Sequence, residues 1–250
     1  MVFGKLEPKQ RFGTLGAYAI ASKAGTVPLP DGVSPEAAAT LGVCGLVTYQ
    51  CLKRNVKRGD HVLINGGSGG TGTFAVQITK AMGCVVTATC SGANVQLCKD
   101  LGADHVVDYR SQSVTQTLAA SDCKFNFILD NIGAPADLYW EAPRFSQPDA
   151  KYVQIGSQVS LGFVYDLAWR FLVPAWLGGG QRPFAFGMAS THYEDFVELG
   201  ALVQEGRVRP VVQEVVGFDE VKAAYERLRT GRCRGKIVVR VLREGEGEEP

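Results

Sequence analysis

The chain has 250 residues, 46% of them hydrophobic, and its 26 basic and 25 acidic side chains leave a formal net charge of +1. This balance is typical of a globular protein with enough mass for one large or two small cores. The scattered Lys and Arg residues form no basic stripe with interleaved aromatic residues, so nucleic acid is excluded as an expected partner.

The N-terminal stretch MVFGKLEPKQ has no apolar signal core and no amphipathic segment rich in Arg and Ser, so the sequence as given predicts no export or transit peptide. The seven cysteines form no C-x-x-C pair and are odd in number, which favours reduced thiols over a disulfide framework. We therefore expect an intracellular protein, cytoplasmic or, with a transit peptide ahead of this stretch, mitochondrial.

Short apolar or β-branched runs alternate with segments of helical character through the middle of the chain. Helix starts are predicted at the N-cap Ser34, at a capping box formed by Thr191 and Glu194, and at Asp219. Such alternation is typical of βαβ units, so we expect an α/β fold with a doubly wound parallel sheet. The predicted strands are 61–65, 85–89, 105–109, 125–130 and 152–156.

Residues 159–178 form an apolar stretch that is long enough to suggest a membrane span. Asp166, Arg170 and Pro174 interrupt the stretch, and charged residues inside a span are costly. We therefore expect no membrane span.

The stretch LINGGSGGTGTFAVQITK, residues 63–80, places five glycines between a predicted strand and a predicted helix. Gly67, Gly69 and Gly72 match the G-x-G-x-x-G pattern, in which the first glycine permits a tight turn, the second admits a pyrophosphate and the third lets the helix pack closely. The N–H groups of Gly70 and Thr71 would hold the phosphates. A purely structural turn is the alternative, but within repeated βαβ units the pattern favours a Rossmann nucleotide site.

The end of the next predicted strand indicates which nucleotide is bound. NAD enzymes place an acid there for the ribose hydroxyl, whereas no acid occurs between Val85 and Lys99. NADPH is therefore favoured, with the Ser91 hydroxyl as a donor to the 2′-phosphate. Ser91 could instead simply begin a loop, and no Arg or Lys stands beside it.

Five stretches of the sequence form a recognisable set: GDHVLINGGSGGTGTFAVQITK (59–80), LGADHVVDYRS (101–111), FNFILDNIG (125–133), FAFGMAS (184–190) and GRCRGKIVV (231–239). The set resembles the quinone oxidoreductase and zeta-crystallin branch of the medium-chain dehydrogenases/reductases. Within that branch it is similar to the reticulon-interacting mitochondrial NADPH oxidoreductases and their fungal relatives. Family members typically carry a further N-terminal stretch, which the sequence as given does not contain.

The resemblance implies cofactor contacts residue by residue. Ser68, Gly70 and Thr71 would meet the pyrophosphate, while Ser91 and Tyr109 would border the adenosine 2′-phosphate. The remaining implied contacts are Asn131 at the ribose, Phe186 and Gly187 at the nicotinamide, and Arg232, Cys233 and Arg234 in a loop that closes over NADPH. Two alternatives stay open, because Asn131 could form an Asx turn with Gly133 and the two arginines could be surface charge.

Cys44, in GVCGLVTY, aligns with a zinc-ligand position of the related zinc alcohol dehydrogenases. A catalytic zinc needs about three protein ligands, and His61, His105 and His192 show no ligand spacing. We therefore expect no metal, and Cys44 as a small buried helix residue.

The resemblance also predicts the domain organisation. Residues 34–205 would form the Rossmann NADPH-binding domain, and residues 1–33 and 206–250 would form part of a GroES-like, β-rich substrate domain. The closing strand KIVVRV, residues 236–241, should therefore lie outside the main sheet.

The function implied is that of an NADPH-dependent, zinc-independent oxidoreductase that transfers a hydride to a quinone or another activated double bond. The alternatives are a trans-2-enoyl thioester reductase and an NADPH-binding protein without turnover, because the N-terminal wall of the substrate pocket is missing. A small-molecule substrate and a homodimer are the expected partners. No catalytic residue is assigned, since Tyr49 and Tyr193 offer hydroxyls without a spacing that identifies an acid.

Overall fold

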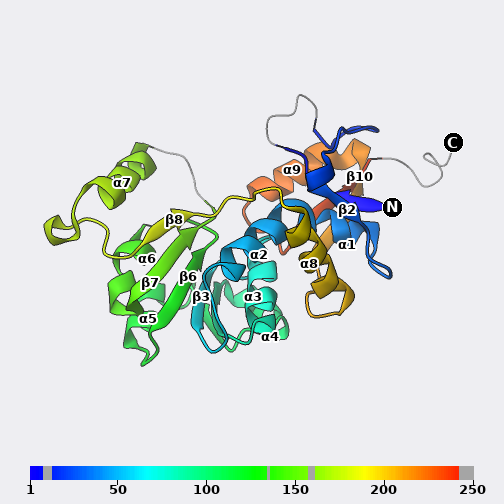
Figure 1. The fold of residues 1–250 in the computed structure, drawn as a ribbon. Coiled ribbons are helices and arrows are strands. Elements are labelled where there is room, and N and C mark those ends of the chain that lie inside the picture. The colour runs from blue at the N-terminus through cyan, green and yellow to red at the C-terminus, as the bar shows by residue number, and fades with distance from the viewer. Residues whose placement is uncertain (8–12, 134–135, 157–160, 242–250) are drawn as a thin grey trace. The chain divides into compact units, whose positions relative to one another are not determined.

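The computed structural model describes residues 1–7, 13–133, 136–156 and 161–241 (Figure 1). Backbone contacts divide the chain into two compact units. The first, here called the sheet unit, comprises Gln50–Ser68 and Ala75–Met188. The second, the terminal unit, comprises Met1–Tyr49, Gly69–Phe74 and Ala189–Pro250. The domain boundaries expected at residues 34 and 205 stay predictions.

A six-stranded parallel sheet forms the centre of the sheet unit, in the order β5-β4-β3-β6-β7-β8 (Figure 1). The order starts at β3 and winds outward in both directions, so the expected α/β fold with a doubly wound parallel sheet is confirmed. All five predicted strands are present. The strands are β3 (His61–Asn65), β4 (Val85–Cys90), β5 (His105–Asp108), β6 (Phe125–Asp130), β7 (Ser146–Gln154) and β8 (Phe184–Phe186).

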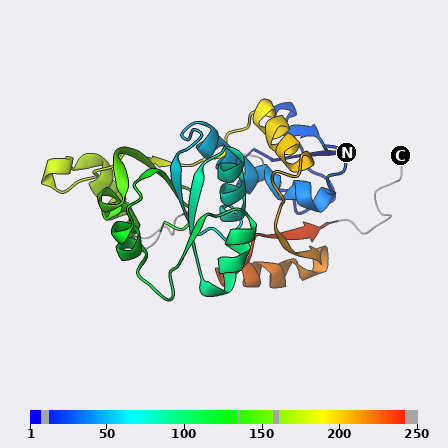
Figure 2. The same ribbon diagram turned by 90° about the horizontal axis from the view of Figure 1, so that it is seen from below.

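Helices cover both faces of this sheet, as its apolar strands require. In Figure 2, α3 and α4 lie on one side of the sheet, and α5 and α6 lie on the other. The bounds are α2 (Leu46–Lys53), α3 (Gly72–Ala81), α4 (Val95–Asp100), α5 (Val114–Ala120) and α6 (Asp137–Trp140).

Residues 62–64 of β3 are completely buried. Leu63 and Ile128 belong to a buried cluster with Leu118 of α5 and Leu138 of α6. Burial of these side chains on the helix-covered face is the main favourable contribution to folding of this unit.

The apolar stretch around 159–178 contains helix α7 (Leu161–Leu172). Its Arg170 is buried, forms an ion pair with Asp166 and donates to Gln154 Oε1 at 3.2 Å. The Arg170 guanidinium also lies 4.2 Å from the ring centre of Tyr139 and 4.8 Å from that of Phe184. Across the described residues, the structure contains no helix whose length and apolar character would let it cross a membrane.

The terminal unit contains two small sheets. β1 (Val2–Gly4) pairs antiparallel with β2 (Thr26–Pro28), and β9 (Val212–Gly217) pairs parallel with β10 (Lys236–Arg240). The closing strand therefore lies outside the six-stranded sheet, as predicted. The helices of this unit are α1 (Pro35–Ala39), the π-turn Leu41–Gly45, α8 (Tyr193–Gln204) and α9 (Val221–Arg229).

Three helix starts were predicted, and one is confirmed. The Ser34 hydroxyl accepts the N–H three residues on at 3.2 Å and caps α1. The N-cap of α8 is His192 and not Thr191, and α9 follows a 3₁₀ turn whose Glu220, rather than Asp219, accepts a backbone N–H. Both errors are local shifts of one or two residues.

The buried cluster predicts that replacing two different leucines of the sheet unit changes the unfolding free energy by very different amounts. Leu63→Ala removes a side chain that is 0% exposed, so the unfolding free energy should fall by about 2–5 kcal/mol. Leu172→Ala, at a side chain that is 79% exposed, should change it by less than about 0.5 kcal/mol. Urea unfolding of both variants measures the difference, and equal losses would contradict it.

Candidate functional site

The loop between β3 and α3 makes a tight turn against β4. The tight turn was expected at Gly67, whereas the left-handed φ of +77° belongs to Gly66, one residue earlier. A Cβ at Gly67 would lie 2.9 Å from Cβ of Ala88 and 3.2 Å from Sγ of Cys98. Gly67 therefore provides close packing rather than the turn itself.

A hydrogen-bond relay holds this turn from across the sheet. The Tyr152 hydroxyl donates to Asp130 Oδ2 at 2.5 Å, and Asn65 Nδ2 donates to Asp130 Oδ1 at 2.7 Å. Thr89 Oγ1 donates to Asn65 Oδ1 at 2.6 Å and accepts from the Gly66 N–H at 3.0 Å. Burial and the neighbouring Asp130 carboxylate raise the pKa of Tyr152, which keeps its hydroxyl protonated as a donor.

A polar cluster forms where β3 and β4 end. Asn94 Nδ2 donates to Ser68 Oγ at 3.1 Å and to Ser91 Oγ at 3.2 Å. Because each hydroxyl accepts from Asn94, its own proton is left to donate to a ligand. Asn94 Oδ1 is buried and has no hydrogen-bond partner among the described residues. The structure thus brings Ser68 and Ser91 together, and it adds Asn94, which sequence reasoning missed.

An acidic side chain also reaches this region from the neighbouring strand. Asp108, the last residue of β5, accepts from the Arg110 N–H, and its Oδ2 would lie 2.7 Å from a Cβ placed on Gly92. Asp108 lies outside residues 85–99, the range whose lack of an acid favours NADPH. Tyr109 follows Asp108, donates its N–H to Cys90 O at 3.1 Å and is 53% exposed.

Asn131 lies at the carboxyl end of β6. Its Nδ2 donates to Asn65 O at 2.9 Å, while its buried Oδ1 has no partner in the described part of the chain. The Asx turn belongs to Asp130, whose Oδ1 accepts the N–H groups of Ile132 and Gly133 at 3.0 Å each. The alternative role of Asn131 in such a turn is therefore wrong, and its oxygen is available to a ligand.

Phe186 and Gly187 lie at the end of β8, the edge strand. The Gly187 N–H donates to Gln154 O at 2.8 Å, and a Cβ there would lie 2.7 Å from Cys51 Sγ. Phe186 is 38% exposed and packs edge-on to Phe163. These residues end a strand of the same sheet as Asn131, but they do not contact the serine cluster in any interaction that we find.

In the terminal unit, Gly70 packs closely on the start of β10. A Cβ at Gly70 would lie 2.9 Å from Lys236 Cδ and 3.3 Å from Gly235 O. The Lys236 ammonium donates to Cys44 Sγ at 3.1 Å. Lys236 thus lies beside the phosphate-binding glycine predicted from the sequence, although only the preceding residues, 232–234, were predicted as contacts.

The three predicted loop residues precede Gly235, whose φ is +63°. The Arg232 N–H donates to Thr230 Oγ1 at 3.2 Å, and the Arg234 N–H donates to Gln213 Oε1 at 2.7 Å. Cys233 Sγ donates to Arg227 O at 3.5 Å. Both arginine side chains are exposed, so their role in binding stays a prediction.

The environment of Cys44 does not suit zinc. The residue is only partly buried, within the π-turn that precedes α2, which corrects the expected buried position. Its thiol faces the Lys236 ammonium, a cation that would repel a metal ion. In the described ranges, no group of three or more His, Cys, Asp or Glu side chains could hold a metal.

The two tyrosines considered as proton donors differ in environment. Tyr49 is buried and donates its hydroxyl to Glu198. Tyr193 begins α8 and is 41% exposed. Neither position identifies a catalytic acid.

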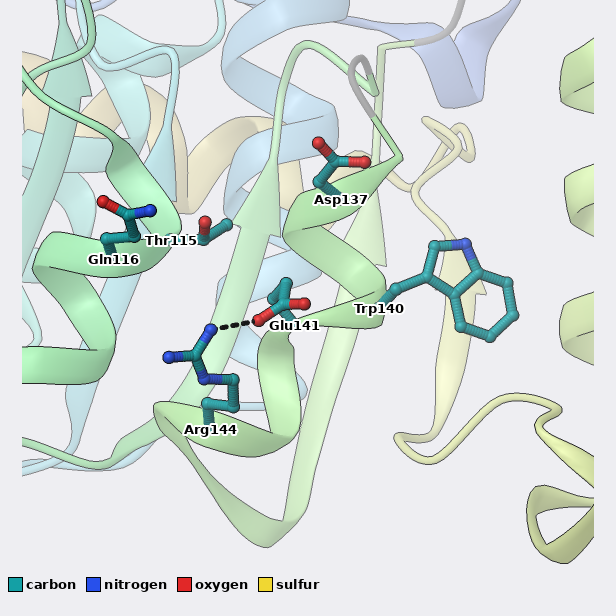
Figure 3. Close-up of a pocket in the computed structure, with 6 residues that line it drawn as sticks. All are labelled: Thr115, Gln116, Asp137, Trp140, Glu141 and Arg144. Carbon is teal, nitrogen blue, oxygen red and sulfur yellow. Dashed lines mark hydrogen bonds and ion pairs between the residues drawn. The ribbon is translucent and has the colours of Figure 1, made fainter.

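A pocket of about 240 Å³ lies elsewhere, between α5 and α6 of the sheet unit. Figure 3 shows Glu141 and Arg144 facing each other, and they form an ion pair of 2.5 Å. None of the predicted cofactor residues lines the pocket. Its lining residues are Thr115, Gln116, Asp137, Trp140, Glu141 and Arg144.

Comparison with known proteins relates the chain to one enzyme family. The profile described as zinc-binding dehydrogenase matches residues 101–239. The trans-enoyl reductase pgmF of Aspergillus terreus is 44% identical over 96% of this chain and 69% of its own length. The mitochondrial NAD(P)H oxidoreductase RTN4IP1 of Mus musculus is 34% identical over 94% of this chain and 63% of its own.

A solved structure supports the same relationship. The quinone oxidoreductase from Coxiella burnetii superimposes with a TM-score of 0.75 at 28% identity, covering 89% of this chain and 66% of that one. The chain thus spans about two-thirds of the length of these proteins.

The packing around Gly70 predicts that even a methyl group is poorly tolerated there. Gly70→Ala must displace Gly235 O or Lys236, so affinity for a nicotinamide nucleotide should fall about tenfold, equivalent to about 1.4 kcal/mol. The control is Gly217→Ala, where a Cβ would approach only Glu220 Oε2, at 3.8 Å. Nucleotide fluorescence titration measures both, and an unchanged affinity in Gly70→Ala would contradict the assignment of this loop.

Proposed function

Because the chain belongs to the zinc-binding dehydrogenase family of medium-chain dehydrogenases/reductases, we propose that it is an NADPH-dependent, zinc-independent oxidoreductase that reduces an activated carbon–carbon double bond. A 2-enoyl thioester is the first candidate substrate. A quinone is the second.

The observation that carries this proposal is the Ser68, Ser91 and Asn94 cluster beside the glycine turn. Two hydroxyl protons and a buried amide oxygen are left for a ligand at the carboxyl ends of β3 and β4. Ligands of doubly wound sheets bind outside the carboxyl ends of the strands. The two hydroxyl donors suit phosphate oxygens, and the amide oxygen can accept from a ribose hydroxyl of a dinucleotide.

Further residues of the chain suit the same cofactor. The buried Oδ1 of Asn131 can accept a hydrogen bond from a ribose hydroxyl. The Lys236 ammonium beside Gly70 places positive charge next to the glycine that we assign to the pyrophosphate. NADPH, when bound, supplies the hydride, and the residues named here would bind and orient it.

The substrate class rests on the relatives. The 44% identity to pgmF, a trans-enoyl reductase, favours an enoyl substrate. The likeness to the Coxiella burnetii quinone oxidoreductase, at 28% identity, favours a quinone as the second candidate. Both are conjugated electrophiles that are reduced by one hydride and one proton. The enoyl thioester keeps both hydrogens on carbon, at the β- and α-positions, whereas the hydroquinone formed from a quinone carries them on its two oxygens.

The preference for NADPH over NADH should depend on the charge of the side chain at position 91. We expect NADPH to bind more tightly than NADH, and Ser91→Asp to lose about tenfold of NADPH affinity, because a carboxylate repels the 2′-phosphate. Ser91→Asn is the matched control, because asparagine has the size of aspartate without its charge. It should lose much less NADPH affinity than Ser91→Asp. Fluorescence titration with both nucleotides measures this.

Asp108→Asn removes a negative charge from the same region, whereas Ser91→Asp adds one. Removing the carboxylate next to Gly92 should raise NADPH affinity a few-fold and leave NADH affinity unchanged. Equal affinities of the unaltered protein for the two nucleotides would contradict the proposed preference.

Activity should not depend on a metal. The purified chain should oxidise NADPH with a trans-2-enoyl thioester, and a chelator should leave the rate unchanged, because Cys44 faces an ammonium and not further ligands. A quinone assay run in parallel ranks the two substrate classes. Activity that is lost on chelation and restored by zinc would overturn the proposal, and NADPH binding without any turnover would favour the non-catalytic alternative.

A further inference from the structure

A thiol and an imidazole meet at the opposite, amino edge of the sheet. Cys123 Sγ lies 3.0 Å from His61 Nδ1. Cys123 precedes β6, and His61 is the first residue of the adjacent β3. We propose that Cys123, with His61 as its general base, is a nucleophilic site that forms covalent adducts with α,β-unsaturated carbonyl compounds.

The pairing of β3 with β6 brings the segments that carry His61 and Cys123 together. β3 and β6 are paired, with Val62 opposite Phe127. The His61 N–H also donates to Asn126 Oδ1 at 2.9 Å, which links the start of β3 to the segment that carries Cys123. A nucleophile and a base within about 2.6–3.2 Å are in the range for proton transfer. Strand pairing and this hydrogen bond therefore keep the start of β3 close to the segment that carries Cys123.

The imidazole is suited to remove the thiol proton. For Nδ1 to accept from the S–H group, the ring N–H must lie on Nε2. Among the described residues, we find no other hydrogen bond to this ring. Burial raises the pKa of the Cys123 thiol, and the nearby Lys124 only partly offsets this. The sulfur is thus protonated at neutral pH and depends on a base to react.

No other described cysteine combines an imidazole partner with partial exposure. Cys51, Cys84, Cys90 and Cys98 are buried. Cys44 and Cys233 are partly exposed, like Cys123, but they face an ammonium and a backbone carbonyl respectively.

The reaction is an addition and needs no oxidant. The sulfur forms a bond to the β-carbon of the electrophile as the carbon–carbon π bond breaks. The thiol proton passes to His61 Nδ1, and the α-carbon takes up a proton from the imidazolium or from water. All atoms of both reactants remain in the adduct.

N-ethylmaleimide, itself an α,β-unsaturated carbonyl compound, is the probe. The 250-residue chain is treated with a limiting amount, and peptide mass spectrometry follows each cysteine over time. Cys123 should react about tenfold faster or more than Cys233, because general-base catalysis accelerates proton removal by at least that factor. His61→Gln should remove this advantage and leave the rate at Cys233 within about twofold.

Three controls make the result decisive. His105→Gln changes an exposed histidine at the start of another strand and should alter neither rate. Circular dichroism establishes that each variant is folded. Cys123→Ser should abolish the fast adduct and keep NADPH affinity, so failure of this site is distinguishable from failure of the proposed cofactor site.

Two outcomes would overturn the proposal. One is that Cys123 reacts no faster than Cys233 in the unaltered chain, a comparison that holds even if His61→Gln does not fold. The other is a folded His61→Gln variant in which Cys123 keeps its full rate.

Discussion

The buried carboxylate of Asp130 determines the shape of the sheet's carboxyl edge. It accepts from the Tyr152 hydroxyl, from Asn65 Nδ2 and from two backbone N–H groups. Burying an ionised carboxylate is costly unless hydrogen bonds replace its water, and here four donors do so. Because Asn65 also accepts from Thr89, which accepts from the Gly66 N–H, the relay joins β7, β6, β3 and β4 to the glycine turn. A substitution of Asp130 would therefore alter the hydrogen bonds that hold the loop that we assign to the cofactor.

The same carboxylate explains why polar atoms are left over at this edge. By forming the Asx turn itself, Asp130 releases the side chain of Asn131, whose Oδ1 then has no partner among the described residues. A second unpaired oxygen, on Asn94, lies beside two hydroxyls that already accept from its amide. Buried polar atoms without partners are uncommon in folded proteins, and both occur at the edge where ligands of doubly wound sheets bind.

Structural features that follow a periodic pattern, or that depend on neighbouring residues, could be predicted from the sequence. The five strands, the glycine loop and the Ser34 cap all depend on residues adjacent in the chain, and the structure contains each of them. The helix starts at Thr191 and Asp219 were wrong because several capping residues stand close together there. Asn94 and Asp108 were missed because only the pairing of strands brings them to the carboxyl edge of the sheet. Lys236 was missed because only its packing on Gly70, within the terminal unit, identifies it. The relay through Asp130 likewise joins residues that are up to 65 positions apart, a separation at which no sequence pattern operates.

The Lys236 ammonium determines the electrostatic environment of Cys44. Cys44, which the resemblance aligns with a zinc-ligand position, accepts a hydrogen bond from the Lys236 ammonium. A zinc site concentrates negative ligands around a cation, whereas this pair places a fixed cation beside a glycine. Such a cation attracts phosphate and disfavours a second cation nearby. We therefore expect this one lysine at the start of β10 to disfavour a metal ion at Cys44 and to favour an anion beside Gly70.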